Sequence, residues 1–248
     1  MIGTIAMREL RALLLTPAGW IILAVTQGLL SYSFLVQVDN FLRVQGKLAG
    51  IPGAPGVTEV IVMPFYGNAA FLLLMVVPLL TMRLISEERR AQTLSLLLAA
   101  PLSFTELVLG KFLGVMLFLV VLVTLLAAMP LALLWGSQLD LGMWSVGALG
   151  LLLLLASFAA VGLFMSALTA QPVTAAIASF GVLLLLWILD WQGDVAGAES
   201  WLAQLSLLAH IRPMLSGLVD TRDVVFFFAL IALFLGLAVH RLAAMVRK

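Results

Sequence analysis

Residues 83–103 read RLISEERRAQTLSLLLAAPLS, a charged segment followed by a leucine run and a proline. The chain has 25 charged side chains (13 Lys and Arg, 12 Asp and Glu), and seven of them lie in or beside this stretch: Arg83, Glu87, Glu88, Arg89, Arg90, Glu106 and Lys111. The flanking sequence is almost uncharged. Charge gathered in this way within apolar surroundings predicts a surface that faces water and receives a docking partner.

The composition places the rest of the chain in a membrane. Of its 248 residues 64% are hydrophobic and 10% charged, with a mean hydropathy of +1.21, whereas soluble domains are about 25% charged. The net charge of +1 indicates no attraction to nucleic acid. The absence of cysteine excludes disulfides and thiol catalysis. Residues 1–16 lack a small-residue cleavage site, so they do not resemble a removable signal peptide.

Six segments are long and apolar enough to cross a bilayer, which takes about 20 residues. The sequence therefore predicts an all-α, polytopic membrane protein with a single domain over residues 1–248. Pro78 is expected to kink the second span. The expected spans are residues 18–38, 65–82, 112–135, 144–168, 173–191 and 224–242.

Lys and Arg in the connecting segments predict that both termini are cytoplasmic. With that orientation nine cations lie inside (Arg8, Arg11, Arg83, Arg89, Arg90, Lys111, Arg241, Arg247 and Lys248) and four outside (Arg43, Lys47, Arg212 and Arg222). The short connections 136–143 and 169–172 predict that spans three and four, and four and five, are antiparallel neighbours.

Three segments outside the spans are also expected to contain helix. Residues 1–16 mix apolar side chains with Arg8, Glu9 and Arg11, which predicts an interfacial helix interrupted by Pro17; the alternative is a plain extension of span one. Residues 39–64 are rich in Gly and Pro, so we expect an irregular loop with helical ends. Residues 201–210 are amphipathic and too short to span, which favours a re-entrant or interfacial helix.

Catalytic motifs are missing from the sequence. It has no GxxxxGK[ST] phosphate loop, so the chain is not expected to hydrolyse ATP alone. His210 and His240 are expected to form hydrogen bonds rather than to bind metal, and Ser157 and Ser166 to bond back to their own helices. The middles of the spans hold no ionisable residue, which argues against an ion-coupled carrier, as does the lack of a visible inverted repeat. The driving energy must therefore come from elsewhere.

The charged stretch itself predicts a helix, a break and a second helix. Ser86 is expected to cap the first helix, with Glu87 and Glu88 complementing its dipole. Leu94, Leu97 and Leu98 would form its apolar face, and Pro101 would end it. Ser103 and Glu106 form a capping box for the next helix. The simpler alternative is a solvated, positively charged cytoplasmic loop.

The same residues resemble the signature of ABC-2 type permeases, S-E-E-(R/K)-(R/K)-x-(G/Q)-T-(L/I)-E, then a leucine run and S-P-(V/L)-S. The chain differs in having Ser95 in place of Glu and Ala100 before the proline. A second, less specific match resembles the gliding-motility permease subgroup and comprises Arg212, Gly217, Leu218, Val219, Asp220, Arg222, Asp223, Val224, Val225 and Phe226.

The resemblance implies a dimer of six-span subunits, homodimeric or related and heterodimeric, in the bacterial cytoplasmic (inner) membrane, with an ABC ATPase subunit beneath each. ATP and Mg would bind the ATPase, and this chain would bind no cofactor. Spans one, two and five commonly form the dimer interface in this family. Membrane lipids and a periplasmic protein are further expected partners. Residues 83–110 would form the coupling region, with the N-terminal helix beside it.

The ATPase contact would comprise Ser86, Glu87, Glu88, Arg89, Arg90, Thr93 and Leu94. The extracytoplasmic region before the last span would include His210, Arg212, Asp220, Arg222 and Asp223. The alternative function is a membrane scaffold that moves no substrate and that anchors or mechanically drives a soluble or periplasmic partner.

Overall fold

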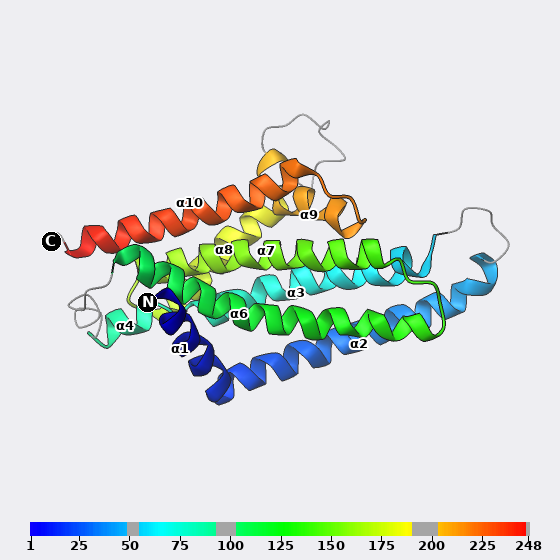
Figure 1. Cartoon of the computed structure of the whole chain (residues 1–248), viewed down its shortest axis with the longest axis horizontal. Helices are drawn as coiled ribbons and strands as arrows, with labels where there is room; N and C mark the ends of the chain where they lie inside the picture. The colour runs from blue at the N-terminus through cyan, green and yellow to red at the C-terminus, as the bar shows by residue number, and fades with distance from the viewer. Residues whose placement is uncertain (49–54, 93–102, 190–202, 247–248) are drawn as a thin grey trace.

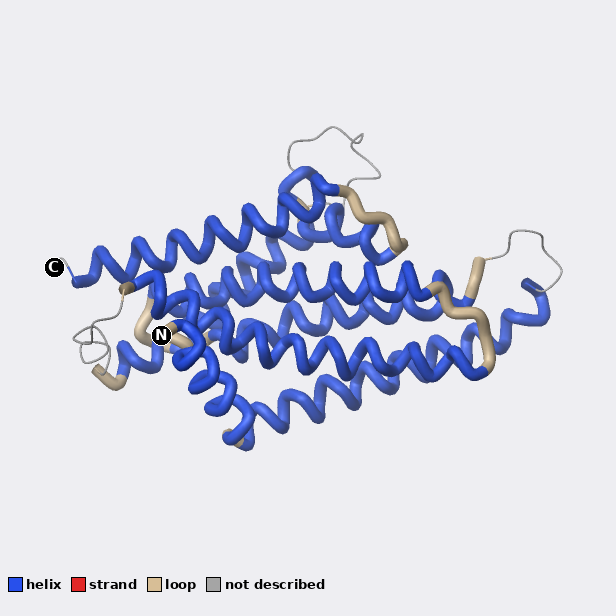
Figure 2. The backbone as a smooth tube through the Cα atoms, in the orientation of Figure 1, coloured by secondary structure: helices blue, strands red, loops and turns tan. Residues whose placement is uncertain are grey.

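The structure is a computed structural model that describes residues 1–48, 55–92, 103–189 and 203–246. Within these ranges the chain is helical and contains no β-strand, as Figure 2 shows. Thr93, Leu94, the leucine face and Pro101 of the predicted coupling region lie outside the described residues.

The helices lie roughly side by side along the long axis of the molecule (Figure 1). Two short 3₁₀ turns and one π-helical turn accompany them: η2 (Ala132–Trp135), η3 (Ala203–Leu205) and η1 (Thr58–Val62). The α-helices are α1 (Ile2–Leu15), α2 (Pro17–Leu48), α3 (Met63–Thr81), α4 (Ser86–Arg90), α6 (Phe104–Leu131), α7 (Leu141–Leu168), α8 (Pro172–Ile188), α9 (Leu207–Leu215) and α10 (Thr221–Val246).

In the described part of the chain, five helical segments are long and apolar enough to cross a membrane: Pro17–Gly46, Thr58–Arg90, Phe104–Trp135, Leu141–Leu168 and Thr221–Met245. They correspond to five of the six expected spans. The fifth expected span, 173–191, coincides with α8, which has only 17 residues. At about 1.5 Å per residue it is about 25 Å long, short of the ~30 Å hydrocarbon core. The count of six spans therefore stays a prediction.

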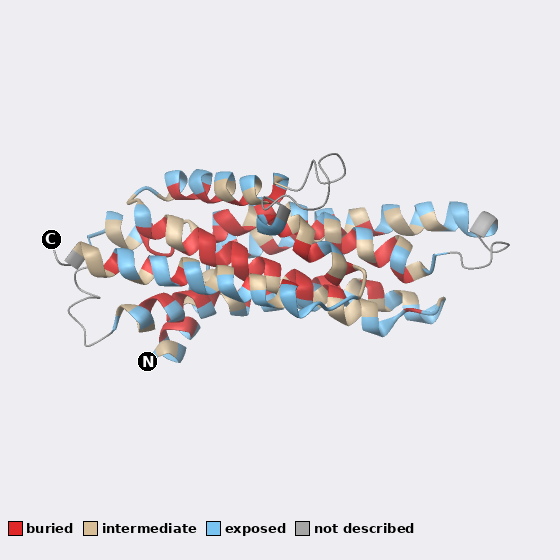
Figure 3. Ribbon diagram, turned by 90° about the horizontal axis from the view of Figure 1, so that it is seen from above, coloured by how far each residue is buried: buried red, intermediate tan, exposed pale blue. Residues whose placement is uncertain are grey.

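The core is centred on α7, which packs against α3, α6, α8, α9 and α10. Its most apolar window is 67% buried, whereas the corresponding windows of α2 and α10 are 22% buried. Small residues along α7, such as Ala159, Ala160 and Gly162, allow its neighbours to approach closely. Figure 3 shows this contrast between a buried centre and exposed outer helices. The contacts of α7 with α6 and α8 agree with the neighbours expected from the short connections.

The first long helix extends further than the sequence predicted. Residues 39–64 were expected to be an irregular loop with helical ends, and the first of these ends is the part of α2 from Asp39 to Leu48. An ion pair one turn apart, between Arg43 and Asp39 at 2.8 Å, supports this extension. At 32 residues α2 is about 48 Å long, so its last turns project past the length that a bilayer needs.

A sharp corner separates α1 from α2. Thr16 has an extended backbone (φ −82°, ψ 139°), so α1 is a separate helix and not an extension of α2. Gly19 is required here because a Cβ would collide with the carbonyl of Leu13. The indole Nε1 of Trp20 donates to the carbonyl of Leu14 at 2.6 Å and closes the corner. The position of α1 at the membrane surface stays a prediction.

Candidate coupling site

The turn from α3 into α4 differs in one respect from the sequence prediction. α4 begins at Ser86, as expected, with Glu87 and Glu88 in its first turn. However, Ser86 does not cap the helix, because the N-cap position is Ile85. The Ser86 hydroxyl instead donates to the carbonyl of Met82, at the end of α3. Its bond therefore ties the new helix back to the preceding span.

Ser166 of α7 holds this turn in place. Its hydroxyl oxygen accepts hydrogen bonds from the backbone amides of Ile85 and Ser86, each at 3.0 Å, and donates to the carbonyl of Met82 at 3.0 Å. The expectation that Ser166 bonds to its own helix was wrong, since backbone groups left over at the α3–α4 turn compete for its hydroxyl. Ser157 behaves as expected and donates to Leu153 in its own helix.

Arg89 adds a second link between α4 and α7. Its Nη1 donates to the carbonyl of Ala167 at 3.0 Å, in the last turn of α7. A cation at a helix C-terminus satisfies an orphan carbonyl and interacts favourably with the helix dipole. The inner side of α4 is thus attached to the most buried helix of the bundle.

Lys111 joins α4 to two further helices. The Lys111 side chain is 2% exposed, and its ammonium contacts Glu88 of α4 at 2.7 Å and Glu9 of α1 at 3.0 Å. Arg8 approaches the same carboxylates, at 3.3 Å from Glu9 and 3.7 Å from Glu88. A buried ammonium is tolerated only when it is paired and hydrogen-bonded. The predicted site residues Arg8, Glu9 and Glu88 therefore form one charged cluster with Lys111.

Two glycines bring α1 close enough for these contacts. A Cβ at Gly110 would lie 2.7 Å from the Cβ of Ile5, and one at Gly114 would lie 2.5 Å from the Cβ of Glu9. Gly110 and Gly114 form a GxxxG pattern on α6, which permits close backbone approach in membrane helices. The sequence reasoning missed both the glycines and the role of Lys111. The GxxxG spacing around a lone lysine was the signal that could have found them.

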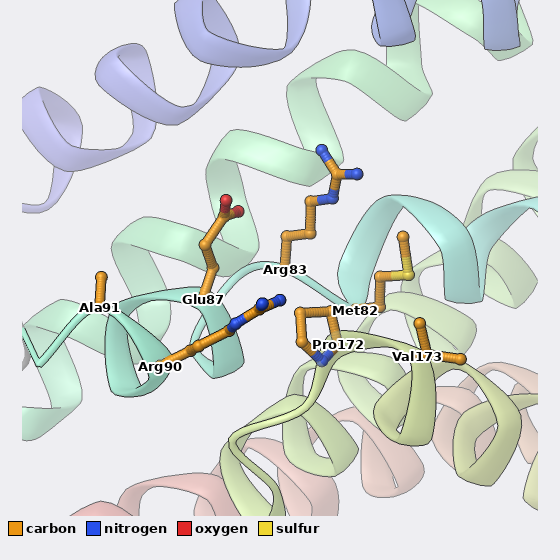
Figure 4. A pocket seen from close by; sticks show the side chains of 7 residues that line it. All are labelled: Met82, Arg83, Glu87, Arg90, Ala91, Pro172 and Val173. Carbon is orange, nitrogen blue, oxygen red and sulfur yellow. The ribbon is translucent and has the colours of Figure 1, made fainter.

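The outer side of α4 is exposed and charged. Arg83, Glu87 and Arg90 are exposed, and none of the three forms an ion pair within the described part of the chain. They line an open cavity of about 500 Å³ together with Met82, Ala91, Pro172 and Val173 (Figure 4). α8 therefore supplies the opposite wall of this cavity, which we call the α4–α8 cavity. Arg11 is also exposed but lies outside it.

The second helix of the charged stretch begins as predicted. The backbone amide of Ser103 donates to Glu106 Oε2 at 3.0 Å, and the amide of Glu106 donates to Ser103 Oγ at 3.2 Å. This capping box was confirmed. It fixes the start of α6 at Phe104, seven residues before Lys111, and so contributes to the placement of the charged cluster.

At the opposite part of the bundle the structure joins two predicted residues, His210 of α9 and Asp223 of α10. Their side chains meet at 2.6 Å, and the second ring nitrogen of His210 lies 3.0 Å from the Gln204 carbonyl. The imidazole stacks on Phe226, with ring centres 3.9 Å apart. Ser206 caps α9 through the amides of Leu208 and Ala209. Arg212, Asp220 and Arg222 are exposed instead.

The helices, the core and the charged ends of the bundle together indicate the class of protein. Long apolar helices, a buried helical core and charges gathered near the helix ends describe a multi-pass membrane protein. The model of the ABC-2 family transporter proteins matches residues 31–245, so the chain belongs to that family. The comparison with curated proteins finds no match. A member of this family is a permease component of an ABC transporter, is generally non-catalytic and normally works with an ABC ATPase subunit.

Proposed function

We propose that this chain couples ATP hydrolysis by a separate ABC ATPase subunit to movement of a substrate, or to transmission of force, across the membrane. α4 receives the motion of the ATPase and passes it to the spans. ATP and Mg bind the partner, and this chain supplies the moving membrane part. The resemblance of residues 212–226 to the gliding-motility subgroup stays a prediction.

The observation that carries the proposal is the two-sided character of α4. Its inner side is attached to α7 through Ser166 and Arg89, and to α1 and α6 through Glu88 and Lys111. Its outer side presents Glu87 and Arg90 to the open α4–α8 cavity. A force applied to the outer side would therefore reach three helices through short, directional bonds.

The arrangement of the chain supports a cytoplasmic α4. In Figure 1 the N-terminus, α4 and the last turns of α10 lie at the same end of the bundle. Ends on one side require an even number of crossings, which α8 completes as the sixth. The predicted excess of Lys and Arg on this side supports a cytoplasmic location, and the bacterial inner membrane is part of the same proposal.

The coupling proposal is tested by reversing the charge of Arg90. In the assembled complex we expect Arg90→Glu to reduce permease-dependent ATPase activity about tenfold, the effect of losing a charge-assisted contact. Arg222→Glu, the same change at an exposed cation of the opposite part of the bundle, is the matched control and should leave the activity unchanged. Equal activity in the two variants would contradict the contact at α4.

A second permease subunit is proposed to cover α2. This helix is mostly unburied, and Val25 is 55% exposed on it. The chain contains no cysteine, so Val25→Cys would be its single thiol. We expect oxidation in native membranes to give a cross-linked dimer, whereas Leu149→Cys on α7, also exposed, should stay monomeric. A cross-link at Leu149 alone would move the interface away from α2.

A further inference from the structure

A second cavity lies between the α3–α4 turn and the α1–α2 corner, and it shares Met82, Arg83 and Glu87 with the α4–α8 cavity. Its volume is about 560 Å³, which is within the range of small-molecule sites. One wall is apolar and comes from Leu13, Ile22, Leu79 and Leu80; the other is charged and comes from Glu9, Arg83, Glu87, Glu88 and Lys111. We call this the elbow groove. It is amphipathic, as a site for one end of a lipid would be.

The apolar wall continues into the surface that faces the bilayer. Leu79, which lines the groove, is 49% exposed on α3. Trp20, at the corner, is 61% exposed while its indole N–H is hydrogen-bonded. Exposed tryptophans of this kind mark the headgroup level of a membrane. The groove therefore opens at the depth where a phospholipid places its headgroup and first methylenes.

The charges of the groove select the headgroup. Arg83 and Glu87 are four residues apart but form no ion pair, because residues 82–85 are a turn and not a helix. Figure 4 shows both side chains extending to the same side of the turn, whereas Arg90 extends toward Pro172. In the described structure this leaves a cation and an anion side by side, each lacking a counter-ion.

The charges of the lining residues favour a zwitterionic headgroup over an anionic one. Its lining includes three carboxylates (Glu9, Glu87 and Glu88) against two cations (Arg83 and Lys111). Lys111 is already occupied by Glu9 and Glu88, so only Arg83 is left for a phosphate. A purely anionic headgroup would also meet Glu87 at close range. An ammonium on the same headgroup would neutralise Glu87 and donate hydrogen bonds to it.

We propose that the elbow groove binds one zwitterionic aminophospholipid, with its phosphodiester on Arg83, its primary ammonium on Glu87 and its acyl chain along Leu13, Ile22 and Leu79. The lipid fills the angle between α1 and α3 and contacts the α3–α4 turn directly. It is thus placed to set the rest position of α4. The binding depends on the membrane location of the chain and not on the proposed ATPase contact.

The test uses the purified full-length chain without the ATPase. The protein is exchanged into an equimolar mixture of phosphatidylethanolamine, phosphatidylcholine and phosphatidylglycerol with identical acyl chains, and the retained lipid is counted by native mass spectrometry. We expect one tightly retained phosphatidylethanolamine. Arg83→Gln should lower its retention about tenfold, the effect of losing one charge-assisted hydrogen bond. Glu87→Gln should remove the preference over phosphatidylglycerol.

Two controls keep the result interpretable. Arg11→Gln removes an exposed cation of α1 outside the groove and should not change retention. Ala12→Phe fills the groove from its rim and should reduce retention of all three lipids. Helical circular dichroism and gel filtration establish that each variant is folded.

Several outcomes would overturn the proposal. Equal retention of phosphatidylcholine would show that no ammonium donates to Glu87. A preference for phosphatidylglycerol would show that the charges of the groove do not exclude an anionic headgroup. Retention unaffected by Arg83→Gln would place the lipid elsewhere. Release of the lipid on addition of the ATPase, one for one, would assign the groove to that partner. Failure of lipid binding leaves the Arg90→Glu test of coupling untouched.

Discussion

Two parts of the bundle each contain a buried contact between polar side chains of different helices, but their surroundings differ. At the α4 end, Lys111 binds Glu9 and Glu88, and Glu88 lies on the same short helix as the exposed Glu87 and Arg90. At the outer end, His210 binds Asp223 and is covered by Phe226. Glu88 lies one residue from the exposed Glu87, and Asp223 lies one residue from the exposed Arg222, but the His210 and Asp223 side chains are themselves buried.

The comparison teaches that a buried polar contact between helices does not by itself mark a functional site. Both pairs join helices that are distant in sequence, and both cost desolvation that the pairing must offset. The Lys111 cluster differs in that it lies beside an open cavity lined by the exposed charges of Arg83, Glu87 and Arg90. The proposed coupling therefore involves the Lys111 cluster, and a structural role is expected for His210 and Asp223.

The largest expected effect comes from breaking the inner cluster. Lys111→Met leaves Glu9 and Glu88 with only the exposed Arg8 as a cation, which should cost about 3 kcal/mol of unfolding free energy, the lower end of the range for breaking a buried pair. Denaturant unfolding followed by helical circular dichroism measures this loss, and permease-dependent ATPase activity should fall with it. The triple variant Lys111→Met, Glu9→Gln, Glu88→Gln removes the charges together and should recover most of the stability. A stable Lys111→Met single variant would refute the buried role of the lysine.

The outer pair should respond differently. His210→Ala leaves Asp223 with one fewer charged hydrogen bond and should cost about 1.5–3 kcal/mol. In membranes at growth temperature, however, the folded fraction should keep its permease-dependent ATPase activity per molecule. Arg222→Ala, an exposed neighbour, is the control for stability. Loss of coupling comparable to that of Lys111→Met would remove the distinction between the two ends.

The smallest expected loss of stability concerns Ser166, which holds the α3–α4 turn. Ser166→Ala deprives the amides of Ile85 and Ser86 of their acceptor and should cost about 1–2 kcal/mol. Ser157→Ala, also on α7 but bonded only to its own helix, should change stability by less than about 0.5 kcal/mol. Hydrogen exchange at residues 85 and 86 should speed up in the first variant alone. Unchanged exchange there would mean that Ser166 does not hold the turn.

Local sequence features predicted much of the fold. Apolar runs identified five long helices, Pro17 marked the corner after α1, and the Ser103–Glu106 spacing placed the start of α6. These three predictions are correct because hydropathy, proline and helix capping each act over a few neighbouring residues. A helical end after Asp39 was expected, but not its length, because the polar residues there resemble a loop while an ion pair one turn apart supports the helix.

The sequence by itself determined that this protein is a bundle of membrane helices with one charged, water-facing segment, because burial of apolar side chains and satisfaction of backbone groups are settled locally in a bilayer. Only the tertiary structure decided which charges of that segment are available. Lys111 and Glu9 are 102 residues apart in the sequence. Ser166 is 80 residues from Ser86, whose backbone amide donates a hydrogen bond to it. Such pairings depend on how helices pack, so the same Glu-Glu-Arg-Arg motif supplies both the internal links and the exposed surface.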